Sequence, residues 1–318
     1  MRRSSMVKYY QLRNQFLNRV SLPQKYRHLL SKESVWGWLF LVPTLVSLGL
    51  VSVYPVFRAA YLSMNEYNGI TPPTWVGPAH YVKILSGWPE FWQVLLNTVS
   101  WAFGSIIIML LVGMGFAVLL NREFRGRNVV QGLLLLPWAM PYIAVALNFQ
   151  WMYNYNLGVF NGLLRLVGLG AIPWIGSSKF ALFSAMLGWV WRNFPFFMIS
   201  FLAAMKAIPD SLYEAALVDG SSRWELFRHI TLPYLQPVII VTTLLMSLWT
   251  FNNFTMIFVL TSGGPGMSSM VLPVYVYNNA FLSNSVGLAS AIGMVMMVIM
   301  LGYGLVYLQL YRQDIGQV

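Results

Sequence analysis

Long stretches without charged residues dominate this chain, and short polar segments rich in Lys and Arg separate them. These stretches are residues 34–57, 91–121, 128–164, 229–311 and, with Arg192 as its one charged residue, 180–205. A helix needs about 20 apolar residues to cross a bilayer, so each stretch has room for at least one membrane span. The stretch 229–311 holds two spans because a turn-forming segment, residues 261–269, interrupts it.

The sequence therefore predicts an all-α integral membrane protein with six transmembrane helices. The expected spans are residues 36–57, 95–120, 129–151, 180–205, 235–260 and 286–310. Of all residues, 58% are hydrophobic and 9% are charged, against roughly 45–50% and 25% in soluble domains. This composition excludes a water-soluble globule. We expect a basic tail, residues 1–33, followed by one six-span domain, residues 34–318.

The distribution of positive charge predicts the orientation, because loops rich in Lys and Arg stay in the cytoplasm. Most of the twenty Lys and Arg residues fall in the tail before the first span and in two loops, residues 122–127 and 206–228. Both termini are therefore expected in the cytoplasm. The opposite side holds Arg58, Lys83, Arg165 and Lys179. The formal net charge of +11 thus reflects insertion into a lipid bilayer, and no nucleic-acid partner is expected.

Composition also argues against several kinds of chemistry. The chain has no cysteine, and its three histidines lie far apart in sequence, so neither a disulfide nor a metal site is expected. No Gly-rich loop ending in Lys-Ser/Thr is present to cradle nucleotide phosphates. The chain itself is therefore not expected to be an enzyme. Trp138 and other tryptophans near the span ends are assigned to an interfacial aromatic belt.

One predicted cytoplasmic loop, residues 206–233, has helix signals of its own. Pro209 suits the first position of a short helix, and Gly220 suits the left-handed residue that ends it. Ser222 and Glu225 have the spacing of a capping box that starts a second helix. That second helix is expected to stop at Pro233.

Two interpretations of this loop follow from local physics. It could be a plain surface hairpin that links two spans. However, Leu212, Leu217, Trp224 and Phe227 form an apolar surface that a solvated linker does not need. Such a surface, beside the small residues Ala215 and Ala216, suits docking into a groove of a soluble partner.

The loop resembles the cytoplasmic signature of the membrane subunits of binding-protein-dependent ATP-binding-cassette importers. The matching positions are Glu214, Ala215, Ala216, Asp219, Gly220, Ile230, Leu232 and Pro233. The resemblance implies the type I importer permease fold, in which the loop's first helix sits in a cleft of an ATPase subunit. Glu214 would then face polar or basic groups of that ATPase, the two alanines would permit close approach, and Gly220 would supply the turn.

Other segments resemble the carbohydrate-uptake class, in particular the larger membrane subunit of the maltose importer. They are residues 41–44, 54–55, 97–98, 136–141, 251–254 and 261–265. The resemblance implies a bacterial or archaeal inner-membrane location and three kinds of protein partner. These are a second six-span permease subunit, two cytoplasmic ATPase subunits that hold ATP and Mg, and an extracytoplasmic solute-binding protein. No cofactor is expected on this chain itself.

Two groups of polar and aromatic residues are candidates for the sugar path. A guanidinium within a span is costly, about 2.5–3.5 kcal/mol by insertion scales, so Arg192 should face substrate, a cavity or a protein partner. Carried over from the family, substrate contacts fall on Trp191, Asn193 and Phe196 beside Arg192, and on Met246, Trp249, Thr250 and Asn253 in the fifth span. The alternative is that Arg192 and the asparagines only bond neighbouring helices. Asn252 and Asn253 point about 100° apart on a helix, so we expect at most one to face the cavity.

The predicted function is the channel-forming subunit of an ATP-driven sugar importer that works by alternating access. Phe196 and Thr250 differ in type from the maltose pattern, so another sugar is possible. A first alternative is the same importer class carrying an anionic sugar or a glycerol phosphodiester, with Arg192 as the charge reader. The others are an ion-coupled carrier without an ATPase and a membrane-anchored assembly protein without a transport path.

Overall fold

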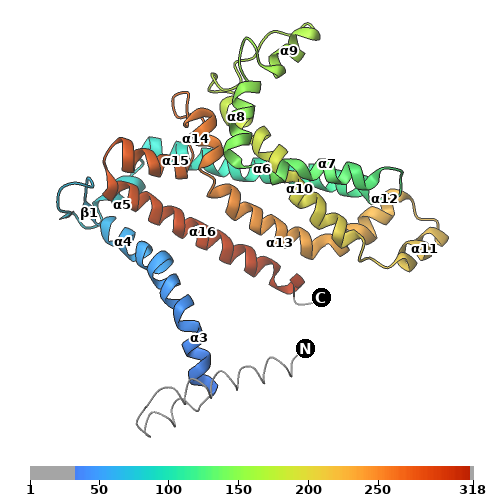
Figure 1. Cartoon of the computed structure of the whole chain (residues 1–318), viewed down its shortest axis with the longest axis horizontal. Coiled ribbons are helices and arrows are strands. Elements are labelled where there is room, and N and C mark those ends of the chain that lie inside the picture. Colours follow the sequence, from blue (N-terminus) through green and yellow to red (C-terminus); the bar gives the residue numbers. More distant parts are fainter. Residues whose placement is uncertain (1–32, 316–318) are drawn as a thin grey trace, which may run out of the picture. The chain divides into compact units, whose positions relative to one another are not determined.

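The structure is a computed structural model that describes residues 33–315, and the chain divides into two compact units, residues 1–59 and 60–318. The predicted basic tail, residues 1–33, lies outside the described residues except for Glu33. The described part of the first unit is helical (Figure 1), with α3 (Glu33–Leu48), the π-helical turn η1 (Gly49–Val53) and the start of α4 (Tyr54–Leu62). Residues Phe40–Leu62 form a helix long and apolar enough to cross a membrane, as predicted for the first span.

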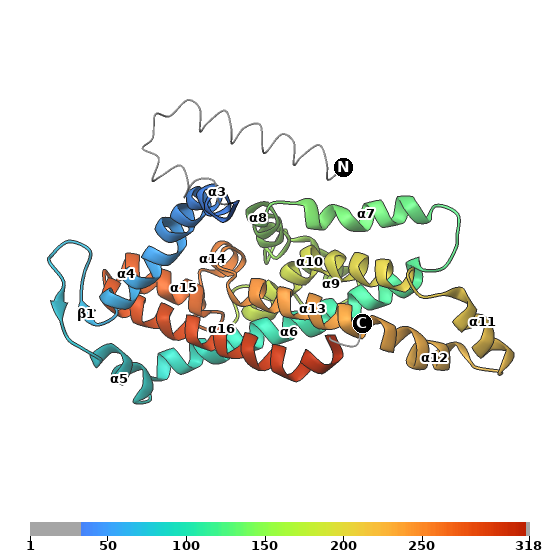
Figure 2. The same ribbon diagram turned by 90° about the horizontal axis from the view of Figure 1, so that it is seen from below.

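The second unit is almost entirely helical. Its elements are β1 (Asn65–Glu66), β2 (Thr74–Trp75), α5 (Ala79–Leu85), α6 (Pro89–Leu120), α7 (Arg127–Ala139), α8 (Tyr142–Met152), α9 (Val159–Leu166), α10 (Ala181–Met205), α11 (Asp210–Val218), α12 (Arg223–Leu226), η2 (Phe227–Thr231), α13 (Leu232–Phe251), α14 (Thr255–Thr261), α15 (Leu272–Tyr277), η3 (Asn278–Leu282) and α16 (Val286–Ile315). Figure 2 shows α6, α10, α13 and α16 running lengthwise beside one another.

The core of this bundle is aromatic and apolar. Trp101 of α6 and Trp189 and Phe197 of α10 are almost fully buried. Helices α6 and α10 approach closely at Gly113, where an added Cβ would lie 2.5 Å from Cβ of Phe197. Small residues at such contacts let helix backbones pack closely within a membrane, where the hydrophobic effect contributes little.

The number of spans agrees with the prediction. Four helices in the described part of the chain are long and apolar enough to cross a membrane, and the total rises to the predicted six when two bent helix pairs each count as one span. The pairs are α7 with α8, bent by 96°, and α10 with α11, bent by 72°. The structure is therefore that of an all-α multi-pass membrane protein.

Two predicted spans are not continuous helices, which corrects the prediction. The expected span 129–151 breaks between α7 and α8 at Met140, which is extended (φ −75°, ψ 141°) because Pro141 follows it. The expected span 235–260 ends at Phe251, and α14 begins at Thr255. There the amide of Asn252 donates to the carbonyl of Leu248, and such local bonds compete with helix propagation.

The prediction that Pro233 stops the second loop helix is also wrong. Residues Arg223–Phe251 run on as one helical segment from the loop into the fifth span. The backbone passes through the π-helical turn η2 directly before α13, and Pro233 then occupies one of the first two positions of α13. Proline is tolerated there because its missing N–H would lack an intrahelical partner in any case.

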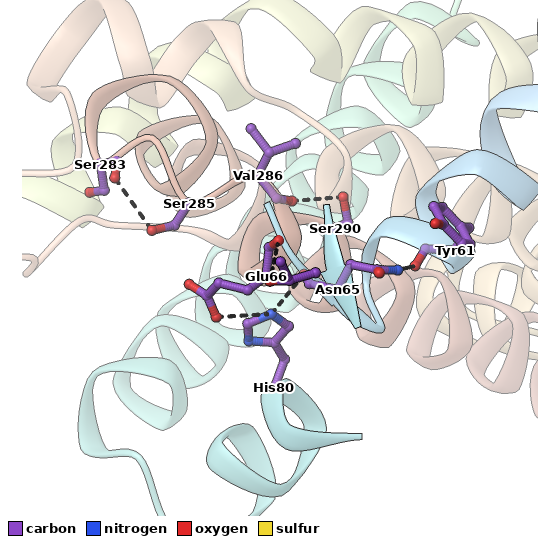
Figure 3. Close-up of polar contacts among 9 residues, drawn as sticks. Tyr61, Asn65, Glu66, His80, Ser283, Ser285, Val286 and Ser290 are labelled. Atoms are coloured by element: carbon purple, nitrogen blue, oxygen red, sulfur yellow. Dashed lines mark hydrogen bonds and ion pairs between the residues drawn. The ribbon is translucent and has the colours of Figure 1, made fainter. Parts of the chain in front are cut away.

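A short hairpin packs against the start of α16. The backbone N–H of Gly287 donates to the carbonyl of Tyr67 at 3.1 Å, and a Cβ on Gly287 would collide with the carbonyl oxygen of Asn65. Nε2 of His80 lies 3.1 Å from the Asn65 carbonyl oxygen and 4.0 Å from a carboxylate oxygen of Glu66. Figure 3 shows the His80 ring between these two partners. These contacts join β1, α5 and α16.

Candidate functional site

The breaks in the third and fifth spans open a cavity of about 710 Å³. Its lining comes from the ends of α7 and α13, the starts of α8 and α14, and the middle of α10. The lining residues are Trp138, Ala139, Tyr142, Trp189, Arg192, Leu248, Trp249, Asn252, Asn253, Phe254 and Thr255. The two interruptions that sequence patterning missed therefore form the walls of the site.

Arg192 is held inside this cavity by three contacts. Its Nε donates to the carbonyl oxygen of Met140 at 3.0 Å, and Nη1 donates to Oδ1 of Asn193 at 2.9 Å. The guanidinium carbon lies 3.7 Å from the ring centroid of Tyr142, within the range of a cation–π contact. The Met140 carbonyl is free to accept because the helix breaks at that residue. Arg192 thus bonds the broken third span to α10.

Aromatic rings form much of the remaining wall. The Tyr142 ring stacks on Trp189 with ring centroids 5.2 Å apart. Phe196, a predicted path residue, does not line the cavity but packs against the Trp249 ring, with centroids 5.7 Å apart. Trp249 keeps 47% of its surface exposed, so its ring remains available to a bound molecule. Such flat apolar faces beside a few polar groups are typical of sites that bind sugar rings.

Asn252 and Asn253 both line the cavity, although we expected at most one to face it. That expectation assumed a continuous helix, and the helix ends at Phe251. Oδ1 of Asn253 accepts a hydrogen bond from the backbone N–H of Met256 at 3.0 Å, which leaves its side-chain NH2 unbonded to protein in the described chain. Asn252 is exposed to the cavity.

The other predicted path residues lie around the cavity and not on its lining. Thr250 is fully buried, and its Oγ1 accepts from Nε1 of Trp189 at 3.0 Å. Met246 is fully buried in the core, and the amide of Asn193 donates to the Trp189 carbonyl. Trp191 packs edge-on against Phe149, outside the cavity.

Sequence reasoning missed several lining residues. Trp138 was assigned to an interfacial belt, and no role was given to Tyr142, Phe254 or Thr255. A signal was present, because Pro137 and Pro141 flank Trp138 and two prolines this close interrupt a helix. Had the break been inferred from them, Trp138 and Tyr142 would have become candidates for a cavity wall.

The predicted coupling loop forms the expected short helix α11 and left-handed turn, and the second helix that follows runs on into the fifth span. Gly220 has φ +82°, the Gly220 N–H donates to the Leu217 carbonyl, and the Ser221 N–H donates to the Ala216 carbonyl. This pattern is a Schellman motif, which ends α11 with a left-handed glycine. We expected Pro209 at the first helical position, but it is extended and directly precedes α11 as its N-cap residue.

The second loop helix starts with the predicted capping box. The Ser222 N–H donates to the Glu225 carboxylate at 2.6 Å, and the Glu225 N–H donates to the Ser222 hydroxyl oxygen at 3.4 Å. Hydrogen bonds to Ser222 hold the pKa of the Glu225 carboxyl below its ordinary value. The carboxylate is therefore ionised at neutral pH, the form that accepts the hydrogen bond from the Ser222 N–H.

Most of the predicted coupling residues are exposed on the surface of the loop. Glu214, Ala215, Asp219 and Gly220 are exposed, as are Leu232 and Pro233, whereas Ala216 and Ile230 are half-buried. Leu217 and Val218 expose 56% and 88% of their surfaces. The Tyr213 hydroxyl lies 2.9 Å from the Thr231 hydroxyl and ties the back of α11 to η2. Helix α11 thus presents small, acidic and apolar side chains outward from a fixed base.

Comparison with known proteins assigns the family. Residues 109–313 match the family described as binding-protein-dependent transport system inner membrane component. The chain belongs to this family of multi-pass inner-membrane permeases. It is 36% identical over 300 residues to the trehalose/maltose transport system permease protein MalF of Thermococcus litoralis, which covers 93% of this chain and 99% of that protein. A second relative, the sulfoquinovosyl glycerol transport system permease protein SmoG of Agrobacterium fabrum, is 33% identical. The match covers 92% of this chain and 95% of that protein.

Solved structures agree on the fold. A chain of a bacterial ABC transporter involved in the import of the acidic polysaccharide alginate superposes with a TM-score of 0.76, at 23% identity, over 92% of this chain and 99% of that one. A chain of the MetNI methionine ABC transporter superposes with a TM-score of 0.52 at 16% identity, over 71% of this chain and 97% of that one. The type I importer permease fold predicted from the sequence is therefore confirmed.

Proposed function

We propose that this chain is one of two membrane subunits of an ATP-driven importer of a sugar, most simply a neutral oligosaccharide. The observation that carries the proposal is the cavity walled by Trp138, Tyr142 and Trp249, with amide groups from Asn252 and Asn253. Sugar rings stack their C–H faces on aromatic rings, while their hydroxyls pair with amides. Relatives named as permeases for trehalose/maltose, for diacetylchitobiose and for sulfoquinovosyl glycerol support a sugar cargo.

The contacts of Arg192 favour a neutral cargo over an anionic one. Two of its guanidinium nitrogens bond Met140 and Asn193, and its flat face covers Tyr142. An arginine that binds a carboxylate or phosphate presents both nitrogens of one guanidinium edge for a bidentate contact. In this arrangement Arg192 positions the cavity wall, and the N–H groups left for a cargo are the second one on Nη1 and the two on Nη2.

The proposal includes partners that act on the open face of α11. Glu214, Ala215 and Leu217 suit insertion into a cleft of a cytoplasmic ATPase, which would hold ATP and Mg and perform hydrolysis. A second six-span permease would complete the channel, and an extracytoplasmic binding protein would deliver the sugar. This chain then needs no cofactor of its own. An ion-coupled carrier fits poorly, because Arg192 is the one charged residue on the cavity lining and no carboxylate lies there to bind a coupling ion.

The test is ATPase activity in lipid nanodiscs after co-expression of this chain with its candidate sister permease and ATPase. Binding proteins charged with neutral or acidic sugars are added one at a time. Stimulation by a binding protein charged with a neutral sugar supports the proposal, and stimulation only with an acidic sugar replaces the neutral cargo by an anionic one. Failure of the ATPase to associate with the membrane subunits contradicts the importer function.

A further inference from the structure

A second cavity lies at the connection between α6 and α7. Its volume is about 420 Å³, and its lining residues are Glu123, Phe124, Gly126, Arg127, Asn128 and Val129. The preceding residues Asn121 and Arg122 line a smaller cavity together with Tyr213 and Arg223 of the coupling loop. The connection therefore lies at the same end of the bundle as that loop (Figure 2), which the charge distribution assigns to the cytoplasm.

The guanidinium of Arg127 lacks partners there. Its Nε and Nη2 atoms are buried from solvent, and neither has a hydrogen-bond partner in the described part of the chain. Buried donors normally find acceptors, and an unpaired buried charge is costlier still. Glu123 also lines the cavity, yet it forms no ion pair with Arg127. An anion in the cavity would satisfy these two donors once the Arg127 side chain, which lines the cavity, turns toward it.

The charge around this cavity favours an anion. Arg122, Arg125 and Arg127 fall within six residues that contain one acidic residue, Glu123. Guanidinium groups match phosphate oxygens by two parallel hydrogen bonds. Basic pockets at the cytoplasmic ends of membrane helices are suited to anionic lipid headgroups.

The apolar surface that continues from the cavity distinguishes a lipid from a free phosphate. Val129, Leu133 and Leu136 follow one another along one side of α7 and expose 66%, 60% and 59% of their surfaces. The stripe begins at the cavity, because Val129 also lines it. A phospholipid bound by its phosphate at Arg127 would lay an acyl chain along this stripe. A free phosphate ion would leave the stripe uncovered.

We propose that the cavity between α6 and α7 is a binding site for the headgroup of an anionic phospholipid, with Arg127 as its phosphate ligand. The lipid headgroup completes the hydrogen bonding of Nε and Nη2, and its acyl chain covers the exposed side of α7. The site lies apart from the sugar cavity, since the two share no lining residue. It does not depend on the proposed cargo.

The experiment is native mass spectrometry of the full-length chain released from mild detergent, titrated with dioleoyl phosphatidylglycerol or dioleoyl phosphatidylcholine. We expect a first phosphatidylglycerol to bind at least tenfold more tightly than phosphatidylcholine. Arg127→Gln should abolish that preference. Arg125→Gln is the matched control. Arg125 lies two residues before Arg127 and carries the same charge, but its side chain is exposed and does not line the cavity. Its replacement should change the affinity less than threefold.

Each other outcome has a defined meaning. Equal losses in the Arg127→Gln and Arg125→Gln variants would reduce the site to general surface charge, and equal binding of the two lipids would exclude an anionic headgroup; either result overturns the proposal. Displacement of the lipid by millimolar inorganic phosphate alone would assign the site to free phosphate. An Arg127→Gln variant that keeps the preference for phosphatidylglycerol would exclude Arg127 as the phosphate ligand and overturn the proposal. If the Arg127→Gln variant does not fold, the lipid preference of Arg127→Lys is compared with that of Arg125→Lys. Both substitutions keep the positive charge.

Discussion

Arg192 of α10 donates a hydrogen bond from Nε to the backbone carbonyl of Met140, 3.0 Å away, at the point where the third span breaks. The carbonyl is available because Met140 is extended before Pro141, which takes its C=O out of the helical hydrogen-bond ladder. The break and the arginine therefore require each other: the break supplies an acceptor, and the arginine holds the broken ends beside α10. Trp138 and Tyr142, on either side of this break, line the cavity together with Arg192.

Replacement of Arg192 should impair the transport of any sugar. Arg192→Gln loses the cation–π contact with Tyr142 and part of the bonding to Met140, which together correspond to about 2 kcal/mol. We expect uptake of neutral and acidic cargo to fall to a similar degree in a whole-cell assay. Selective loss of acidic cargo would show that Arg192 reads substrate charge, and the first alternative function would then hold.

Trp249 should contribute directly to sugar affinity. Its half-exposed ring faces the cavity, and loss of an aromatic stacking surface costs about 0.5–1.5 kcal/mol. Trp249→Ala is therefore expected to raise the KM for uptake by roughly three- to tenfold. The control is Trp191→Ala, since Trp191 is similarly exposed but lies outside the cavity. Equal effects of the two substitutions would argue against sugar stacking on Trp249.

Cysteine labelling should map the cavity in this cysteine-free chain. Asn252 is exposed and lines the cavity, whereas Asn193 exposes 1% of its surface. A hydrophilic thiol reagent should therefore modify Asn252→Cys and leave Asn193→Cys unmodified in the assembled complex. Protection of Asn252→Cys by saturating sugar would add support for the site. Labelling of Asn193→Cys alone would be inconsistent with this cavity.

The left-handed turn at Gly220 should be essential for coupling. A β-branched residue resists a φ of +82°, so Gly220→Val should disrupt the end of α11 and uncouple ATP hydrolysis from uptake. Asparagine tolerates the left-handed region, so Gly220→Asn should retain most of the coupling. Both are measured as the ratio of sugar transported to ATP hydrolysed. Normal coupling in the valine variant would contradict this role of the turn.

Close packing of α6 on α10 should limit substitution at Gly113. A methyl group there would overlap Phe197, so Gly113→Ala should destabilise the bundle by about 1–3 kcal/mol. Gly115 on the same helix has nothing within 4 Å of an added Cβ, and Gly115→Ala should be neutral or slightly stabilising. Thermal unfolding in detergent compares the two variants. A lower melting temperature for the Gly115 variant would contradict the packing of these helices.

The capping box should weaken in acid. Because hydrogen bonds to Ser222 lower the pKa of Glu225, the folded loop favours the carboxylate, and its contribution to stability is lost as the pH falls through that lowered pKa. Hydrogen exchange at residues 222–226, corrected for the intrinsic pH dependence, should therefore lose protection in acid. Glu225→Gln should remove this pH dependence. An unchanged profile in that variant would mean that another group titrates.

The sequence by itself determined the membrane class, the six-span count and two helix boundaries within the coupling loop, at Gly220 and at Ser222. Each of these depends on information local to the chain, whereas the type I permease fold was predicted from the resemblance to a family. Charge-free stretches mark spans because ions are costly in lipid, and Ser222, Glu225 and Gly220 mark helix ends because their side chains or backbone angles act within a few residues.

Only the tertiary structure decided where the spans break and which residues share the cavity. The break at Met140 and the end of α13 at Phe251 fall within apolar stretches that average hydropathy reads as continuous. Both are compatible with a membrane because partners distant in sequence satisfy exposed backbone groups, as Arg192 does for Met140. Trp138, Tyr142 and Asn252 became neighbours through those breaks, so helical periodicity along either span could not have brought them together.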